Sequence, residues 1–415
     1  MESKLSRRKF LYMTTGTAAG AVGAGIVGGP ARAQEKVEGG SEGGSSGGLQ
    51  QISQNSGPVF GTSFVSPAVE LFGDIFIGER CFVAGNTILR AAPTLRLEIG
   101  DETNAQDNVV ARALDENSTV GSRVSLAHHA IVRDSEVGDF AFVGFWAVIE
   151  DAVVGEGCLI MARGRVRGVT LAPNRVVGPG VIVEDQATAD ALPTIDEMGE
   201  EFKLEVLEVN AEFAESYIEL YEEEGYQAVI GAGAEPLTSF NPERVEPQVA
   251  SDVELGEFVR IVGDVRIGSG SRIRQRTSVR ADEGAPIIIG PNADIRNRVT
   301  FHALKDTSLV VGDNLFADDD AVLHGPLKAG SNISVGNESV LFRARVEDDV
   351  TIGDRAVVQG SASEDGTLEL VIPSGTVIPD GAVVTDAETL AQYTGRITEI
   401  PDTGGVSLRD IIPGL

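Results

Sequence analysis

Three histidines are placed so that they could bind a catalytic metal. The chain holds four histidines, and His302 and His324 lie in the similar segments "VTFHAL" and "VLHGP". His128 lies far from them, in "VSLAHHAIVRD". A catalytic zinc ion takes three protein ligands and leaves one position open. Such an ion lowers the pKa of water to about 7 and so supplies a nucleophile at neutral pH. The three histidines therefore need a scaffold that brings distant segments together.

A six-residue apolar rhythm predicts that scaffold. Apolar residues recur at every sixth position, as in the series Ile99, Ala105, Ala111, the series Val120, Leu126, Val132, and the series Ile289, Ile295, Phe301. Each hexapeptide would form one short strand and a turn, and three of them, roughly 18 residues, would close one triangular coil. A helical interpretation fails because Gly, Asn and Asp recur too often at the turns. We therefore predict an all-β protein made of parallel β-helix coils.

The rhythm occurs in two blocks, which we place at 57–195 and 247–385. Residues 88–114 match 278–304 without gaps, which indicates a tandem duplication. Between the blocks, residues 196–230 predict a long amphipathic helix packed along the first block. Residues 386–415 form a shorter C-terminal tail with room for one helix.

The first residues predict export. Arg7 and Arg8 precede a Gly/Ala-rich apolar run, and "ARA" is a small-residue cleavage signal. We interpret 1–34 as a twin-arginine signal peptide, so we expect an extracellular, cell-surface or periplasmic protein. A membrane anchor is the alternative, but the run is short and Gly-rich for a span. Residues 35–56 predict a flexible Gly/Ser/Glu linker.

Composition restricts the possible partners. The formal net charge is −30, which argues against nucleic acid or an anionic membrane as a partner, because both are polyanions. The same charge is typical of the hydrated acidic surface of halophilic proteins. Only two cysteines occur, Cys81 and Cys158, and we expect buried thiols rather than a disulfide framework.

The period also predicts which side chains share a face of a coil. In the second block Arg280, His302 and His324 form one column, each about 4.8 Å above the last. The equivalent column of the first block holds arginines: Arg90, Arg112 and Arg133. A second column holds Gln106 and His128 in the first block but Arg296 and Asp319 in the second. One prism cannot turn both columns toward one metal, whereas two prisms side by side can, so we predict a metal site at an interface.

These motifs resemble the gamma-class carbonic anhydrases. "SVRADEG", "VTFHAL" and "VLHGP" are similar to the family's arginine, aspartate and glutamate segment and to two of its three histidine ligands. "VSLAHHAIV" is similar to the third-ligand segment, and "VLEVNAEFAESY" places Asn210 where the family has an active-site asparagine. The resemblance covers about residues 57–385. It implies two tandem left-handed parallel β-helices with a flanking helix, and metal sites between the subunits of a trimer.

The departures from the family divide the site between the two blocks. The first block keeps Gln106 and His128, but has Arg112 and Arg133 in place of two histidines. The second block keeps the opposite half, with Arg296 for the glutamine and Asp319 for the histidine; its retained residues are Arg280, Asp282, Glu283, His302 and His324. We therefore predict one complete site, with His302, His324 and His128 on the metal and Gln106 and Asn210 nearby. Asp319 is the alternative third ligand if second blocks pair with each other.

The complementary interface would set Arg112 and Arg133 against Asp319, where an ion pair would replace the metal. A homo-oligomer with interfacial sites is expected, but a threefold ring cannot alternate two kinds of block, so its symmetry stays open.

The resemblance implies reversible hydration of carbon dioxide to bicarbonate. Gln106 would orient the reacting oxygen, Glu283 would move the proton, and Arg280 and Asp282 would support the site. Zinc is the expected metal, and iron(II) or cobalt(II) would suit the same ligands. Two alternatives remain: a non-catalytic metal-binding or bicarbonate-binding assembly protein, and a hexapeptide acyltransferase on the same scaffold.

Overall fold

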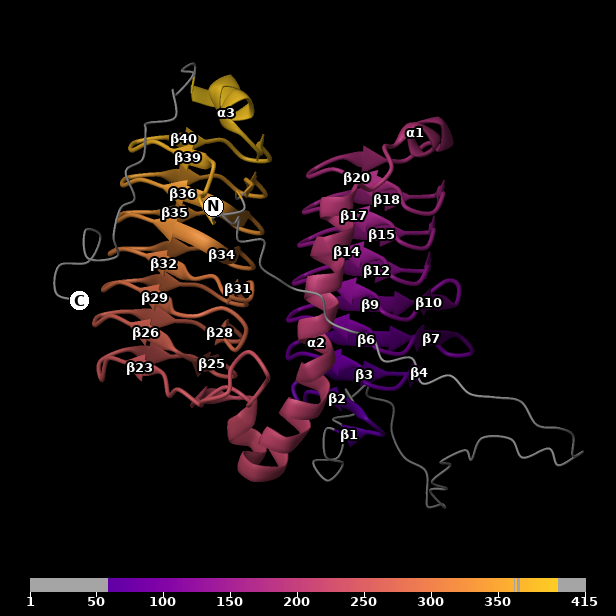
Figure 1. The fold of residues 1–415 in the computed structure, drawn as a ribbon, viewed down its shortest axis with the longest axis horizontal. Helices are drawn as coiled ribbons and strands as arrows, with labels where there is room; N and C mark the ends of the chain where they lie inside the picture. Colours follow the sequence, from indigo (N-terminus) through magenta and orange to yellow (C-terminus); the bar gives the residue numbers. More distant parts are fainter. Residues whose placement is uncertain (1–58, 362, 364–365, 395–415) are drawn as a thin grey trace, which may run out of the picture. The chain divides into compact units, whose positions relative to one another are not determined.

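The computed structural model describes residues 59–361, 363 and 366–394, and these form two stacks of β-coils with a long helix, α2, beside the first (Figure 1). The prediction of two tandem left-handed parallel β-helices with a flanking helix is confirmed. The expected signal peptide at 1–34, the linker at 35–56 and the tail beyond residue 394 lie outside the described residues. Export therefore stays a prediction.

The first stack has three faces, each a sheet of short parallel strands contributed one per coil, and β1 is added antiparallel at the edge of one face. The 8-stranded face contains β1 (Val59–Phe60), β2 (Ser63–Val65), β5 (Phe82–Val83), β8 (Asn104–Ala105), β11 (Ser125–Leu126), β14 (Phe142–Val143), β17 (Leu159–Ile160) and β20 (Val176–Val177). The 6-stranded face contains β4 (Asp74–Ile77), β7 (Arg96–Ile99), β10 (Ser118–Val120), β13 (Glu136–Val137), β16 (Val153–Val154) and β19 (Thr170–Leu171). The 7-stranded face contains β3 (Glu70–Phe72), β6 (Ile88–Ala91), β9 (Val110–Ala113), β12 (Ile131–Arg133), β15 (Val148–Glu150), β18 (Arg165–Arg167) and β21 (Ile182–Val183).

The second stack repeats this plan, but two of its faces are joined into one 13-stranded sheet. The joining strands are β34 (Val322–Ala329) and β36 (Val340–Val346), which run around a corner. One of the two faces contains β22 (Gly231–Gly233), β25 (Arg260–Gly263), β28 (Ser278–Ala281), β31 (Thr300–Ala303), β38 (Val357–Gln359) and β41 (Val383–Val384). The next contains β23 (Gln248–Val249), β26 (Val265–Ile267), β29 (Ile287–Ile289), β32 (Leu309–Val311) and β39 (Leu370–Ile372). The 7-stranded face contains β24 (Glu254–Leu255), β27 (Arg272–Ile273), β30 (Asp294–Ile295), β33 (Phe316–Ala317), β35 (Ser334–Val335), β37 (Thr351–Ile352) and β40 (Val377–Ile378).

The six-residue rhythm marks the inside of each stack. Ile99, Ala105 and Ala111 are buried in the core of the first stack, and Ile295 and Phe301 in the core of the second. Each core is a column of mostly aliphatic side chains from all three faces. Because the inward positions are mostly apolar and neighbouring coils pair largely in register, the outward positions keep a fixed orientation, and polar residues there can form columns.

Four helical segments accompany the coils: α1 (Gln186–Ala191), α2 (Glu197–Glu224), η1 (Gly225–Ala228) and α3 (Ala387–Thr394). The Asp196 side chain caps α2 by accepting from the amide of Gly199, and Gly225 ends the helix at a positive φ of 60°. Phe213 and Tyr217 of α2 pack on Phe64 and Phe82 of the 8-stranded face. Among the described helices, none combines the length and the apolar character that crossing a membrane requires.

The two stacks meet along their corners. Corner residues of both stacks adopt the left-handed backbone conformation, which turns their carbonyls and side chains outward. Side chains from the first stack donate to carbonyls at corners of the second, coil after coil. The pairs are Asn86 Nδ2 to Arg276 O (3.1 Å), Trp146 Nε1 to Asp320 O (3.0 Å) and Arg163 Nη1 to Glu338 O (2.8 Å). This ladder fixes the register of one stack against the other.

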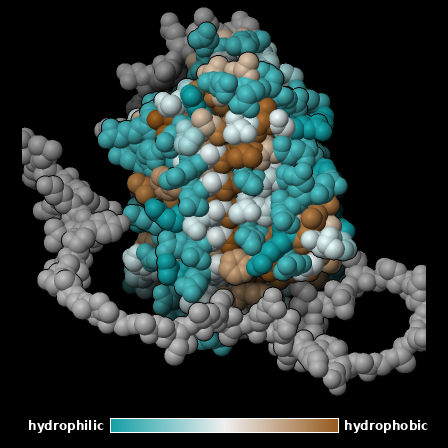
Figure 2. Space-filling model, turned by 90° about the vertical axis from the view of Figure 1, so that its right-hand side faces the viewer, coloured by the Kyte–Doolittle hydropathy of each residue, from teal (hydrophilic) through white to brown (hydrophobic). Residues whose placement is uncertain are grey.

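One side of the molecule is largely hydrophilic (Figure 2). The side of the molecule in Figure 2 is hydrophilic along both flanks, with a narrow apolar band between them. In the first stack the exposed large apolar side chains include Phe76, Val153 and Ile182. The expected homo-oligomer stays a prediction.

Candidate metal centre

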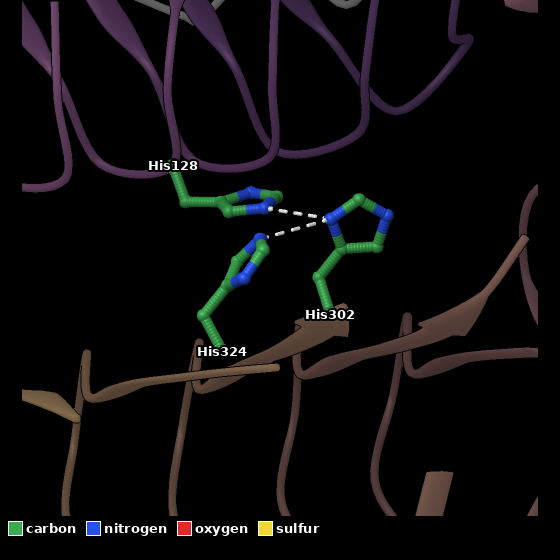
Figure 3. Close-up of side chains that lie close together, drawn as sticks. All are labelled: His128, His302 and His324. Atoms are coloured by element: carbon green, nitrogen blue, oxygen red, sulfur yellow. Dashed lines mark hydrogen bonds between the residues drawn. The ribbon is translucent and has the colours of Figure 1, made fainter. Parts of the chain in front are cut away.

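His128, His302 and His324 converge between the two stacks (Figure 3). His302 on β31 and His324 on β34 are paired in register on adjacent coils, and His128 follows β11 on the facing sheet of the first stack. His302 Nδ1 lies 3.4 Å from His128 Nε2 and 3.3 Å from His324 Nε2. All three side chains are buried. The structure therefore brings together the three residues that the sequence predicts as ligands.

Each ring directs its other nitrogen to an acceptor. His128 Nδ1 lies 3.4 Å from Asp107 Oδ2, and His302 Nε2 lies 3.2 Å from Asp282 Oδ1. His324 Nδ1 donates to the carbonyl of Gly325 at 2.8 Å. In the tautomers with the ring protons on these outer nitrogens, the three inner nitrogens present lone pairs to one another.

This donor set fits a divalent cation. Three lone pairs at this separation repel one another, and a cation between them removes that repulsion. Tetrahedral zinc with Zn–N bonds of about 2.1 Å separates its nitrogens by about 3.4 Å, close to the two distances observed. Burial lowers the pKa of His128 to about 4 and that of His324 well below its usual value, which keeps both rings in the neutral, ligating form.

Arg280 holds the outer carboxylates of both stacks. Its Nε lies 3.1 Å from Asp107 Oδ2 and its Nη1 donates to Asp282 Oδ2 at 2.9 Å. Burial alone would raise the pKa of each carboxyl group, but Arg280 outweighs burial and holds both pKa values well below their usual range. Tyr217 of α2 also donates to Asp282. One buried arginine therefore positions the partners of both His128 and His302.

Gln106 and Glu283 lie beside the histidines. Gln106 Oε1 accepts from the backbone amide of His128 at 3.2 Å, which leaves the Gln106 amino group free to donate elsewhere. Glu283 Oε1 accepts from the amide of Lys305 at 2.9 Å, and Oε2 lies 3.7 Å from His302 Nε2. Burial raises the pKa of Glu283, so this carboxyl is the most readily protonated acid at the site.

An apolar pocket opens onto His324, Gln106 and Glu283. Its walls are hydrophobic side chains of both stacks and of α2: Ala127, Phe142, Phe145, Phe202, Val206, Leu304 and Phe342. The ring of Phe145 lies 4.9 Å from that of His324, centroid to centroid. The pocket is small, about 10 Å³, which is room for about one water-sized molecule beside His324.

Three other residues lie away from this cluster. Asn210 donates to the carbonyl of Val206 in its own helix at 2.8 Å, rather than to the histidines. Asp319 Oδ1 accepts from the backbone and side chain of Asn297, at 2.8 and 2.9 Å, and is not part of the histidine cluster. His129 stacks on Trp146 with ring centroids 4.6 Å apart, at the contact between the stacks. Within this chain the third member of the cluster is therefore His128.

The second predicted interface is not formed within the chain. Arg133 pairs with Asp115, Asp134 and Glu150 of its own stack. A pairing of Arg112 or Arg133 with Asp319 of another chain stays a prediction.

Asp107 and Tyr217 were not identified from the sequence. Asp107 follows Gln106, and Asn297 stands at the equivalent place in the second stack. The stack that carries His128 therefore has an acid at this position, and the stack without that histidine has an amide. Comparing the two blocks position by position would have pointed to Asp107. Tyr217 reaches Asp282 across the contact between helix and stack, and no local pattern of the helix indicates that partner.

Comparison with known proteins identifies the family. No family model matches the sequence. The chain is 31% identical over 181 residues to a carbonic anhydrase of Methanosarcina thermophila, which covers 38% of this chain and 70% of that protein. The chain belongs to the gamma-carbonic-anhydrase-like family of hexapeptide-repeat proteins.

Other relatives match over smaller shares of their length. The chain is 31% identical over 169 residues to the carboxysome assembly protein CcmM of Nostoc sp., covering 38% of this chain and 30% of that protein. The chain spans less than a third of the length of the CcmM proteins that it matches. A hexapeptide transferase family protein of Anaplasma phagocytophilum is 23% identical, with a TM-score of 0.30, and covers 35% of this chain and 87% of that one.

Proposed function

We propose that this protein catalyses the reversible hydration of carbon dioxide to bicarbonate at one metal site per chain, held by His128, His302 and His324. The observation that carries the proposal is the convergence of three buried imidazoles from two stacks, with Asp107, Asp282 and the carbonyl of Gly325 beside their outer nitrogens. The relative named carbonic anhydrase supports the same reaction.

The histidines, the pocket residues and Gln106 would have separate roles in this reaction. A zinc, iron(II) or cobalt(II) ion on the histidines would supply the acidity that makes water a nucleophile at neutral pH. The pocket lined by Phe145, Phe202 and Phe342 holds carbon dioxide against that position and excludes bulk water. Gln106, with its carbonyl oxygen held by His128, directs its amino group toward an oxygen of the substrate or of bicarbonate.

Glu283 is the candidate for moving the proton. Its carboxyl borders the pocket, and its raised pKa lies nearer to neutral pH than that of an exposed glutamate. Proton transfer is fastest when the pKa of the group matches the working pH. Asp282 stays ionised because Arg280 neutralises it, so it orients His302 and does not exchange protons.

Stopped-flow hydration assays on protein loaded with zinc or iron(II) test the proposal. A rate well above that of buffer is expected for the wild type and for His129→Ala, whose ring lies outside the cluster. Buffer-level rates are expected for His128→Ala. A wild type with full metal content and no rate above buffer would contradict catalysis.

That result would favour the second candidate, a non-catalytic assembly protein that binds metal or bicarbonate. The similarity to CcmM supports this alternative. Retained metal in an inactive wild type is its expected signature, because the histidine cluster would then serve structure or ligand binding alone.

A further inference from the structure

A second cavity lies at the contact between the stacks, separate from the pocket on His324. Its volume is about 30 Å³, and it is bordered by both stacks and by Tyr217 of α2. Arg260 of β25 lines it and is only 7% exposed. The Nη1 atom of Arg260 donates to the carbonyls of Gln227 and Gly231, at 3.1 and 3.4 Å. These backbone carbonyls hold the guanidinium from one side.

The other edge of the guanidinium has no partner. Arg260 Nε and Nη2 are both buried without a hydrogen-bond acceptor, and Arg260 forms no ion pair within the described residues. A buried charge is normally paired, because removing it from water costs several kcal/mol. The contrast is Arg280 of the next coil, which lines the same cavity but has two carboxylates, Asp107 and Asp282, within 3.1 Å. Arg260 has none.

The unpaired edge has the geometry of an oxyanion site. Nε and Nη2 carry parallel N–H groups, which match the two oxygens of a planar, carboxylate-type anion. Part of the cavity wall is apolar, where Phe64 and Phe82 line it. Asp107 also borders the cavity; its Oδ1 accepts from Ser278, and its Oδ2 forms an ion pair with Arg280 at 3.1 Å.

We propose that this cavity binds one small planar oxyanion, of the class of bicarbonate, formate or nitrate, on the Nε and Nη2 edge of Arg260. The site is distinct from the histidine cluster, and it does not depend on catalysis. Larger anions are excluded by the volume of the cavity, and a spherical anion such as chloride uses only one of the two N–H groups well.

Thermal unfolding of the full chain at constant ionic strength tests the proposal, with sodium formate exchanged stepwise for sodium chloride. A saturable rise of the midpoint with formate is expected for the wild type. The same rise is expected for Arg274→Gln, an exposed arginine of the same stack that removes an equal charge. Arg260→Gln should need a formate concentration higher by about tenfold or more, since it removes a charge-assisted bidentate pair.

Two further variants, Arg260→Lys and His324→Ala, test whether the anion binds to the Arg260 guanidinium and not to the histidines. Arg260→Lys keeps the charge but not the fork, so it too should lose the response, and it carries the test if Arg260→Gln does not fold. His324→Ala should keep the response, because formate bound at the histidines would be lost there. An unchanged response in Arg260→Gln or Arg260→Lys would overturn the proposal. A response lost in His324→Ala, or equal stabilisation of the wild type by chloride, would do the same.

Discussion

The two stacks have the same fold, but each contributes a different part of the candidate metal site. Equivalent positions hold Arg112 in the first stack and His302 in the second, and Gln106 in the first where the second has Arg296. Both stacks place these residues on outward faces of the coil, at the same points of the repeat. The scaffold therefore decides where a side chain points, whereas the contact between stacks decides which column can do chemistry. Only the columns that face each other retain the metal-site residues.

The largest effect is expected from removing a histidine of the second stack. His324→Ala leaves two nitrogens, one from each stack, and two ligands do not hold a catalytic metal ion firmly. We expect loss of stoichiometric metal and a hydration rate equal to that of buffer, measured by elemental analysis and stopped-flow. His129→Ala is the matched control and should keep both. Full metal content in His324→Ala would show that the ion binds elsewhere.

Arg280→Gln tests the pairing of carboxylates from the two stacks. The substitution leaves Asp107 and Asp282 as buried carboxylates without a cation. Breaking a buried ion pair costs about 3–5 kcal/mol of unfolding free energy, because one charge stays buried and unpaired. Chemical denaturation of the wild type and the variant measures this loss. Arg274→Gln, exposed on the same stack, should change stability by about 0.5 kcal/mol or less; an equal loss in both variants would argue against the pairing.

Acid should weaken the metal-free protein through the facing histidines. The folded pKa values of His128 and His324 are lowered by burial, so between about pH 6.5 and 4 the unfolded chain binds protons that the folded chain does not. Stability therefore falls as the pH falls through this window, by on the order of 3 kcal/mol for His128 alone. Denaturation at pH 7 and pH 5 with a chelator present measures the fall. His128→Gln should show a smaller fall than the wild type, because the variant lacks this lowered pKa. An equal fall in His128→Gln and in the wild type would contradict the assignment to His128.

Asp107→Asn tests whether the third metal ligand is His128 or Asp319. Asp107 fixes the outer nitrogen of His128, and loss of such a partner typically weakens metal affinity by about 10–100-fold. Asp319→Asn, on the second stack, should leave affinity unchanged because Asp319 contacts Asn297 instead. Metal titrations with a competing chelator compare the two variants. The opposite result, with metal lost only in Asp319→Asn, would mean that second stacks pair with each other.

The sequence predicted the coils and the three histidines because both follow from a short repeat. Once each sixth residue points inward, as Ile295 and Phe301 do, the outward direction of His302 is determined. The cavity at Arg260 and the partner of Tyr217 could not be predicted in this way. They depend on the distance between the stacks and on the position of α2. A local sequence pattern predicts neither of these.

The smallest effect is expected from rebuilding the second stack's column on the first. The double variant Arg112→His, Arg133→His places two histidines in register on β9 and β12, as on β31 and β34. Among the described residues no histidine faces that pair from another stack, and the acids beside Arg133 are Asp115, Asp134 and Glu150 of its own stack. We expect one tightly bound metal per chain, as in the wild type, and a stability loss of about 1 kcal/mol, because the pair with Asp115 is exposed and the buried Asp134 keeps its backbone amide donors. A second tightly bound ion, seen by elemental analysis of the monomeric protein, would show that one stack alone can complete the site.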